Sequence, residues 1–235
     1  MLIEIVSDVV CPWCYVGKRQ IEAALAEHAR SNPGAVPPRI QWKPFELNPT
    51  LPEDGMSRHE YVTTKFGAAR SKDVYARVTA VGVEHGIAFA FDRIVRQPNT
   101  LAAHSLIALA GDDRTAAGDD DRGSAGSGAG SGLQDRVVEA LFRAYFIDGA
   151  DLTSHATLAD IAIDAGLERA RVEACLADPA TRQAVRDEEA RARRMGVEGV
   201  PFFILERRLA VSGAQGAEAL LEAIRQLEAS RAAAD

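Results

Sequence analysis

The sequence has few cysteines, no surplus of positive charge and no long apolar run, and each absence excludes a class of protein. Only three of its 235 residues are cysteine. Three thiols cannot all pair within one chain, so a secreted scaffold held by disulfides is not expected. Acidic residues outnumber basic ones by 34 to 27, and the net charge of −7 argues against a nucleic-acid partner, whose phosphates need a basic face. No apolar stretch approaches the roughly 20 residues of a membrane span, so no membrane partner is expected.

The first residues also lack the features of a secretion signal. Residues 1–6, MLIEIV, carry no basic residue, and Cys11 follows almost at once. A signal peptide needs a charged start, an apolar run and a cleavage site of small residues. We therefore expect a cytoplasmic protein, in a compartment where thiols are usually kept reduced.

What the sequence does contain is an ordered pattern of strands and helices at its two ends. Residues 2–6 are apolar and β-branched, a helical period runs from Pro12 to about residue 31, and residues 39–45 alternate as a second strand. Because a helix crosses over between these strands, we expect them to be parallel. Towards the other end, residues 200–205 and 209–212 read as a hairpin and residues 217–228 as a helix. This order predicts an α/β thioredoxin fold built from residues 1–50 and 197–235.

The middle of the chain, residues 51–196, predicts an inserted all-helical domain. The helical period covers residues 57–66, 71–85, 100–110, 134–145, 157–165, 168–176 and 181–195. Ser57 and Ser154 stand where N-caps belong, and Gly86 and Gly196 where C-terminal caps belong. Residues 111–132 are built largely from Gly, Ser, Ala and Asp, a composition that buries too little apolar surface to order itself, so they predict a disordered loop.

The chemistry of the chain centres on Cys11-Pro12-Trp13-Cys14, at the point where the first strand meets the first helix. Free backbone N–H groups and the helix dipole favour a thiolate at Cys11, and Cys14 lies one turn further on the same face. Pro12 suits a first helical turn, and Trp13 frames the sulfur pair. Cys11 is therefore expected to attack a sulfur of the substrate, and Cys14 to resolve the mixed disulfide.

The cysteines also allow two other interpretations, a zinc site and a purely structural pair. Zinc needs about four ligands, yet the chain has no second C-x-x-C, and Cys175 stands in a separate helical segment without a nearby histidine. We therefore predict no metal and assign Cys175 to helix packing or the helix surface. A purely structural pair of buried cysteines stays open as an alternative to the redox pair.

Several sequence blocks resemble the FrnE-type branch of the DsbA-like family. These blocks are SDVVCPWCYVGK at 7–18, WKPFELNP at 42–49, QPNT at 97–100 with Ala103-His104, AYF at 144–146, GVPFF at 199–203 and VSGAQ at 211–215. They span nearly the whole chain in the expected order. The resemblance implies an active site in a cleft between a thioredoxin domain and the inserted helices, with Cys11 and Cys14 as its redox centre.

The resemblance also implies supporting residues and partners. Pro201 should be a cis proline facing the dithiol, with Val200 beside it. His104, Asn99 and Ser212 are candidates for the cleft, although each also fits packing, capping or turn chemistry. No cofactor is expected, and the partners would be protein thiols and disulfides or glutathione as a thiol co-substrate. The oligomeric state is left open.

A related branch of proteins suggests an alternative function. The 2-hydroxychromene-2-carboxylate isomerases and kappa-class glutathione transferases share this architecture, but use a serine-type hydroxyl near glutathione instead of an intact dithiol. Because Cys11 and Cys14 are both present, we predict a DsbA-like thiol–disulfide oxidoreductase or isomerase, with a glutathione-dependent isomerase or transferase as the alternative.

Overall fold

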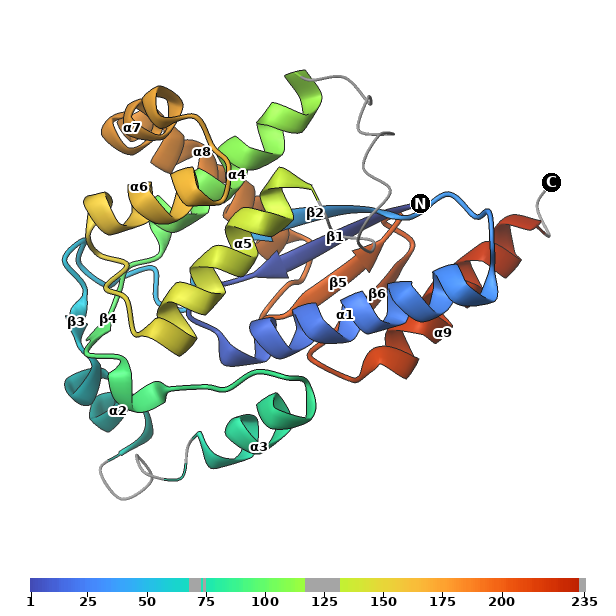
Figure 1. Ribbon diagram of the computed structural model, residues 1–235, viewed down its shortest axis with the longest axis horizontal. Helices are drawn as coiled ribbons and strands as arrows, with labels where there is room; N and C mark the ends of the chain where they lie inside the picture. Colours follow the sequence, from blue (N-terminus) through green and yellow to red (C-terminus); the bar gives the residue numbers. More distant parts are fainter. Residues whose placement is uncertain (68–72, 74, 117–131, 233–235) are drawn as a thin grey trace.

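The computed structural model describes residues 1–67, 73, 75–116 and 132–232, arranged around a four-stranded sheet (Figure 1). The strands are β1 (Leu2–Ser7), β2 (Arg39–Pro44), β5 (Phe202–Leu205) and β6 (Leu209–Ser212), in the order β2-β1-β5-β6. β1 and β2 are parallel, as predicted, and β5 lies antiparallel to both β1 and β6. β5 begins at Phe202 instead of the predicted residue 200, because Pro201 has no N–H to offer the sheet.

Helices cover both faces of this sheet. On one face α1 (Pro12–Ser31) and α9 (Ala217–Ala232) lie side by side (Figure 1), and the core between helices and sheet is built from Ile3, Ile5, Leu25, Phe203 and Ile224. α9 continues four residues past its predicted end at 228. On the other face α8 (Pro179–Arg194) packs Ala192 against Val6 and Phe45. The sheet is therefore buried on both sides, which the short apolar strands predict.

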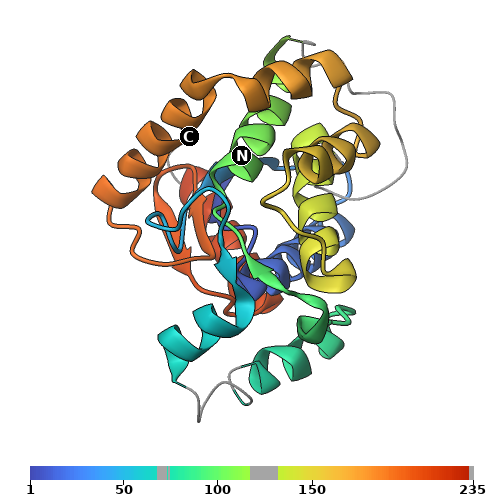
Figure 2. The same ribbon diagram turned by 90° about the vertical axis from the view of Figure 1, so that its left-hand side faces the viewer.

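Further helices connect β2 to β5 and follow the predicted ranges to within a few residues. They are α2 (Arg58–Phe66), α3 (Ala76–Glu84), α4 (Leu101–Ala116), α5 (Leu133–Arg143), α6 (His155–Asp164), α7 (Arg169–Ala177) and α8, with a 3-10 turn η1 (Phe91–Arg93) and a π turn η2 (Ala144–Asp148). The predicted helix 71–85 begins only at Ala76, and residues 71, 72 and 74 of that prediction lie outside the described residues. Figure 2 shows these helices surrounding the end of the sheet.

The predicted disordered loop at 111–132 is wrong at its start. α4 continues through residues 111–116, while residues 117–131 lie outside the described residues and Gly132 caps α5. α4 extends beyond its predicted end because it packs closely against α5. Gln134 of α5 donates to the main-chain oxygen of Ile107 at 3.1 Å, and its side chain lies 2.7 Å from where a Cβ on Gly111 would stand. Gly111 is thus the residue that lets α5 approach α4.

A short two-stranded sheet was missed altogether. β3 (Met56–Ser57) pairs antiparallel with β4 (Arg96–Gln97). Ser57 belongs to this sheet and is also the N-cap residue of α2, as predicted, but its side chain makes no capping hydrogen bond. The predicted cap at Ser154 is confirmed, since its oxygen accepts from the Thr157 N–H at 3.2 Å. Gly86 and Gly196 have positive φ, as the C-terminal caps require.

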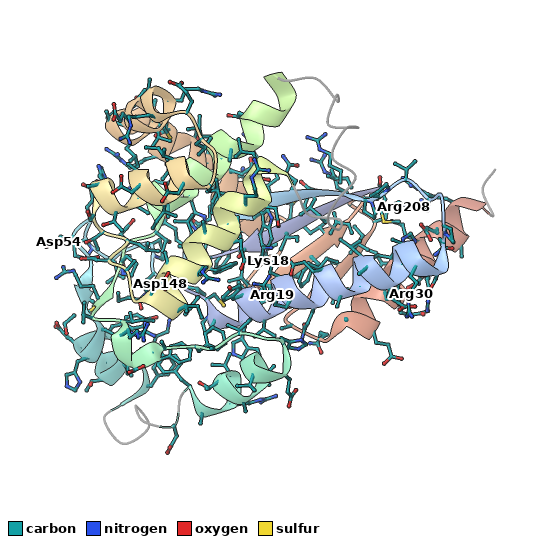
Figure 3. The ribbon with its side chains drawn as sticks, viewed as in Figure 1. Lys18, Arg19, Arg30, Asp54, Asp148 and Arg208 are labelled. Carbon is teal, nitrogen blue, oxygen red and sulfur yellow. The ribbon has the colours of Figure 1, made fainter. Side chains whose placement is uncertain are left out.

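A buried charge network joins α1 to α5. Lys18, only 2% exposed, forms ion pairs with Glu22, Asp135 and Glu139, and Figure 3 shows Lys18 between α1 and α5. Burial alone would lower the pKa of Lys18, but the three carboxylates outweigh burial and raise it. The indole N–H of Trp42 in β2 also donates to Asp135. One compensated cation therefore ties α1, α5 and the sheet together. No helix within the described residues is both long and apolar enough to cross a membrane.

We expect Lys18→Met to lower the free energy of unfolding by about 3 kcal/mol or more, because it leaves the buried Asp135 without a cation beside Glu22 and Glu139, which keep only Arg19 as their partner. Urea denaturation measures this loss. The control is Arg169→Met on α7, where Arg169 and its partner Glu173 are both mostly exposed and little change is expected. Equal urea midpoints for the two variants would contradict this account of the network.

Candidate active site

The structure places the two predicted redox cysteines at the start of α1. Cys11 is the N-cap residue, with extended backbone, and Pro12 is the first helical residue. The main-chain N–H of Cys11 donates to the Asp8 oxygen at 3.0 Å, and that of Cys14 to the Cys11 oxygen at 3.0 Å. Both side chains are free thiols, 5% and 1% exposed. The tight turn after β1 thus holds Cys11 at the helix N-terminus and Cys14 one turn behind it.

The surroundings of the two thiols differ. Burial, the hydrogen bond to Cys11 and the charge of Cys11 raise the pKa of Cys14 well above its ordinary value. The Ser7 hydroxyl and the Asp8 main-chain N–H act in the opposite direction, because each hydrogen-bonds the Cys14 sulfur. Cys14 is therefore the protonated, protected member of the pair. Ser7, which sequence reasoning missed, is the side chain placed to stabilise its thiolate.

The Val200–Pro201 segment faces Cys11, as the resemblance implied. The peptide bond between Val200 and Pro201 is cis, and the Cys11 thiol donates to the Val200 carbonyl with Sγ 3.6 Å from the oxygen. Pro201 packs so closely on α1 that a Cβ on Gly17 would stand 3.0 Å from its ring. Gly17 is therefore the residue that allows β5 to begin directly beside the dithiol.

Trp13 forms the edge of the site next to α3. Its ring is partly buried and packs against the core. The exposed guanidinium of Arg77, in α3, lies 5.8 Å from the centre of that ring, within the range of a cation–π contact. The dithiol is thus bordered by the thioredoxin strands on one side and by α3 on the other.

Beneath the dithiol lies a group of buried polar residues that sequence reasoning largely missed. Asp8 is completely buried; one carboxylate oxygen accepts from the Leu47 N–H at 2.7 Å, and the other lies 3.4 Å from Nε2 of His104 in α4. Burial raises the pKa of Glu46 to about 7, and although His104 opposes the shift, Glu189 and Asp8 add to it. A signal for this group existed, because Asp8 and Glu46 each follow one of two adjacent parallel strands.

For the other residues singled out from the sequence, the structure shows no hydrogen bond with the two thiols. Asn99 holds the start of α4, since its oxygen accepts from the Leu101 N–H at 3.0 Å and its amide donates to the Leu51 oxygen at 2.9 Å. Ser212 is exposed and pairs with Phe202, directly after Pro201. Cys175 is buried in α7, where burial raises its pKa. Within the described residues, no group of three or more histidine, cysteine or acidic side chains has the arrangement of a metal site.

Comparisons with known proteins agree with this geometry. The model of the DSBA-like thioredoxin domain family matches residues 2–119 and 122–225. The crystal structure of a probable DsbA oxidoreductase from Streptomyces coelicolor shares 32% sequence identity and has a TM-score of 0.79, with 96% of this chain and 89% of that chain covered. No curated protein matches.

Two more distant structures share the fold. The cytosolic disulfide reductase DsbM from Pseudomonas aeruginosa, solved with GSH, has a TM-score of 0.59 at 20% identity, covering 97% of this chain and 100% of that chain. A 2-hydroxychromene-2-carboxylate isomerase has a TM-score of 0.64 at 15% identity, and the match covers 100% of both chains. The thioredoxin fold and the DsbA-like resemblance are thereby confirmed, while the FrnE-type branch stays a prediction. Because the family model spans most of the sequence, this chain belongs to the DSBA-like thioredoxin domain family.

Proposed function

We propose that this protein is a thiol–disulfide oxidoreductase in which Cys11 attacks the substrate and Cys14 resolves the mixed disulfide. The observation that carries the proposal is the placement of two free thiols at the N-terminus of α1, with the Cys11 sulfur facing Val200 before a cis proline. Family membership supports thiol chemistry at a coarse level.

The proposed reaction has two exchange steps. The Cys11 thiolate attacks one sulfur of a substrate disulfide, so a Cys11–substrate bond forms while the substrate S–S bond breaks and releases one thiolate. Cys14 then loses its proton to solvent, and its thiolate attacks Sγ of Cys11. The Cys11–Cys14 disulfide forms, and the second substrate thiolate leaves. The substrate is reduced and the dithiol is oxidised; two molecules of a small thiol such as glutathione would restore it and leave as one disulfide.

The environment of Cys14 gives this order a physical basis. In the free dithiol, burial and the charge of Cys11 keep Cys14 protonated. In the mixed disulfide Cys11 carries no charge, so that contribution disappears, whereas the hydrogen bonds from Ser7 and the Asp8 N–H to the Cys14 sulfur persist. Cys14 therefore becomes a nucleophile when it is needed to resolve the intermediate.

We also propose that the protein acts in the cytoplasm. The thiol pool there would keep Cys11 and Cys14 mostly reduced. Reduction or isomerisation of protein disulfides, with glutathione as the thiol co-substrate, is then the favoured direction over net oxidation.

The direct test of the function replaces each cysteine in turn and follows the reduction of a peptide disulfide by glutathione. Cys11→Ser should abolish exchange, because no other thiol reaches the substrate first. Cys14→Ser should accumulate a mixed disulfide on Cys11, detected as a mass increase. Cys175→Ser, in a separate helix, is the control and should behave as the unmodified protein. Full exchange by Cys11→Ser would sink the proposal, and full turnover of glutathione with an electrophile by Cys14→Ser would favour the isomerase or transferase alternative.

A second measurement tests whether the pair is a reversible redox centre. In glutathione buffers of graded ratio, alkylation of free thiols should report a two-electron transition between about −120 and −270 mV, the range of known disulfide oxidoreductases. The Cys175→Ser background removes the third thiol from the readout. A pair that never closes in any buffer would contradict a dithiol mechanism.

The role of Ser7 is tested by Ser7→Ala. Losing a hydrogen bond to a charged sulfur removes about 1.5 kcal/mol or more, so resolution of the mixed disulfide should slow roughly tenfold or more. Quenched-flow measurement of the two steps supplies its own control, because formation of the mixed disulfide by Cys11 should keep its rate. If both steps slow equally, Ser7 supports the fold of the site and not the Cys14 thiolate.

A further inference from the structure

Arg58 is a buried cation at the start of α2, on the helical side of the site. It is only 8% exposed. One guanidinium nitrogen donates to the side-chain oxygen of Gln97 and lies 3.5 Å from the Tyr145 hydroxyl, and another donates to the Tyr75 hydroxyl. The ring faces of Tyr61 and Tyr75 lie 5.5 and 5.0 Å from the guanidinium carbon. These contacts hold the charged group firmly in one place.

None of these partners carries negative charge. Burial raises the pKa of both Tyr75 and Tyr145, so both phenols are neutral. Across the described part of the chain, no carboxylate lies within ion-pair distance of Arg58. Lys18, which is also buried, has three carboxylates as partners. An unpaired buried charge is costly, so Arg58 is a charge for which the fold supplies no anion.

Gln97 gives a second, independent sign of a missing acceptor. Its side chain is 1% exposed, and its oxygen accepts from Arg58 and from Tyr145. The amide cannot be turned round, because its nitrogen would then face the guanidinium. Among the described residues that nitrogen has no hydrogen-bond partner. The Gln97 side chain thus joins the guanidinium to an amide donor without an acceptor, and the N-terminus of α2 adds to the positive potential.

This donor cluster lies at the same end of the molecule as the dithiol. Tyr75 immediately precedes α3, whose Arg77 lies over Trp13. The rings of Tyr75, Phe91, Phe89 and Tyr15 follow one another in contact and connect the cluster to α1. Figures 1 and 2 show α2, β3 and β4 on the side toward which the start of α1 points.

We propose that Arg58, Tyr75 and Gln97 form a subsite for one carboxylate or phosphate group, carried by the substrate whose disulfide meets Cys11. A planar guanidinium with flanking N–H and O–H donors suits such an oxyanion. The same chemistry would accept a free inorganic anion. The assignment to the substrate rests on the proposed exchange activity, whereas anion binding at Arg58 does not.

Anion binding is tested on the full chain by thermal denaturation in inorganic phosphate or acetate against chloride at equal ionic strength. The midpoint of the unmodified protein should rise with phosphate or acetate, as expected for a ligand that binds only the folded state. Gln97→Glu sets a carboxylate against Arg58, so this variant should start from a higher midpoint and lose at least tenfold in anion affinity. Gln226→Glu, an exposed change of equal charge on α9, should keep the response.

Arg58→Gln, if it folds, should also lose the rise in midpoint with phosphate or acetate. The test does not depend on the folding of Arg58→Gln, because Gln97→Glu keeps Arg58 in place. A midpoint of the unmodified protein that does not respond to either anion, or an equal response in Gln97→Glu, would overturn the subsite.

The source of the anion is tested with two peptide disulfides that differ only in one terminal carboxylate or amide. The unmodified protein should prefer the acid in kcat/KM, and Gln97→Glu should reduce that preference tenfold or more. Phosphate binding without any peptide preference would support the subsite and overturn its assignment to the substrate. If neither peptide is exchanged, the proposed function fails while the denaturation experiment still decides whether Arg58 binds anions.

Discussion

The turn that follows β1 depends on one buried carboxylate, and the rest of the site is arranged around it. Asp8 is completely shielded from solvent, yet its main-chain oxygen receives the Cys11 N–H and its side chain receives the Leu47 N–H. The first contact sets where α1 begins, and the second fastens the end of β2 to the same turn. The carboxylate itself accepts from the Leu47 N–H and, at 3.5 Å, from the Val10 N–H within the turn. Because a buried carboxylate needs such donors to offset the loss of water, the turn that positions the dithiol also solvates Asp8.

The buried charged groups around this turn differ in whether they have partners of opposite charge. Between α1 and α5, Lys18 and Arg19 pair with three carboxylates, so each of these cations already has anionic partners within the fold. Arg58 has neutral partners, and Glu46 is a buried acid whose pKa of about 7 lets it change charge near neutral pH. The cation of Lys18 therefore has anionic partners within the fold. Near the dithiol, by contrast, Arg58 has only neutral partners among the described residues and Glu46 is titratable near neutral pH. Titratable groups with shifted pKa values cluster at functional sites, and Glu46 follows that pattern beneath the dithiol.

The two cysteines illustrate how burial separates roles within a symmetric-looking motif. Cys14 is held protonated by burial and by Cys11, with Ser7 and the Asp8 N–H prepared to stabilise its thiolate. Cys11 faces the Val200 carbonyl, where an extended substrate would lie. Membership of the DSBA-like thioredoxin domain family agrees with thiol chemistry, and the asymmetry of the pair gives that chemistry an order of events.

Local patterns in the sequence were enough to predict most helices and strands. The strand, turn and helix around Cys11 and Cys14, the later hairpin and the amphipathic helices are set by neighbours one to four residues apart, and the observed elements follow them closely. Contacts between residues far apart in the sequence could not be predicted, because they depend on how the elements pack. His104 lies beside Asp8, Gln134 reaches across Gly111, and Gln97 orients Arg58. Strands β3 and β4 have two residues each, which is too short to show the alternating apolar pattern of a strand. The sequence around a polar side chain in a helix also does not reveal its buried partner, because packing between elements determines that partner.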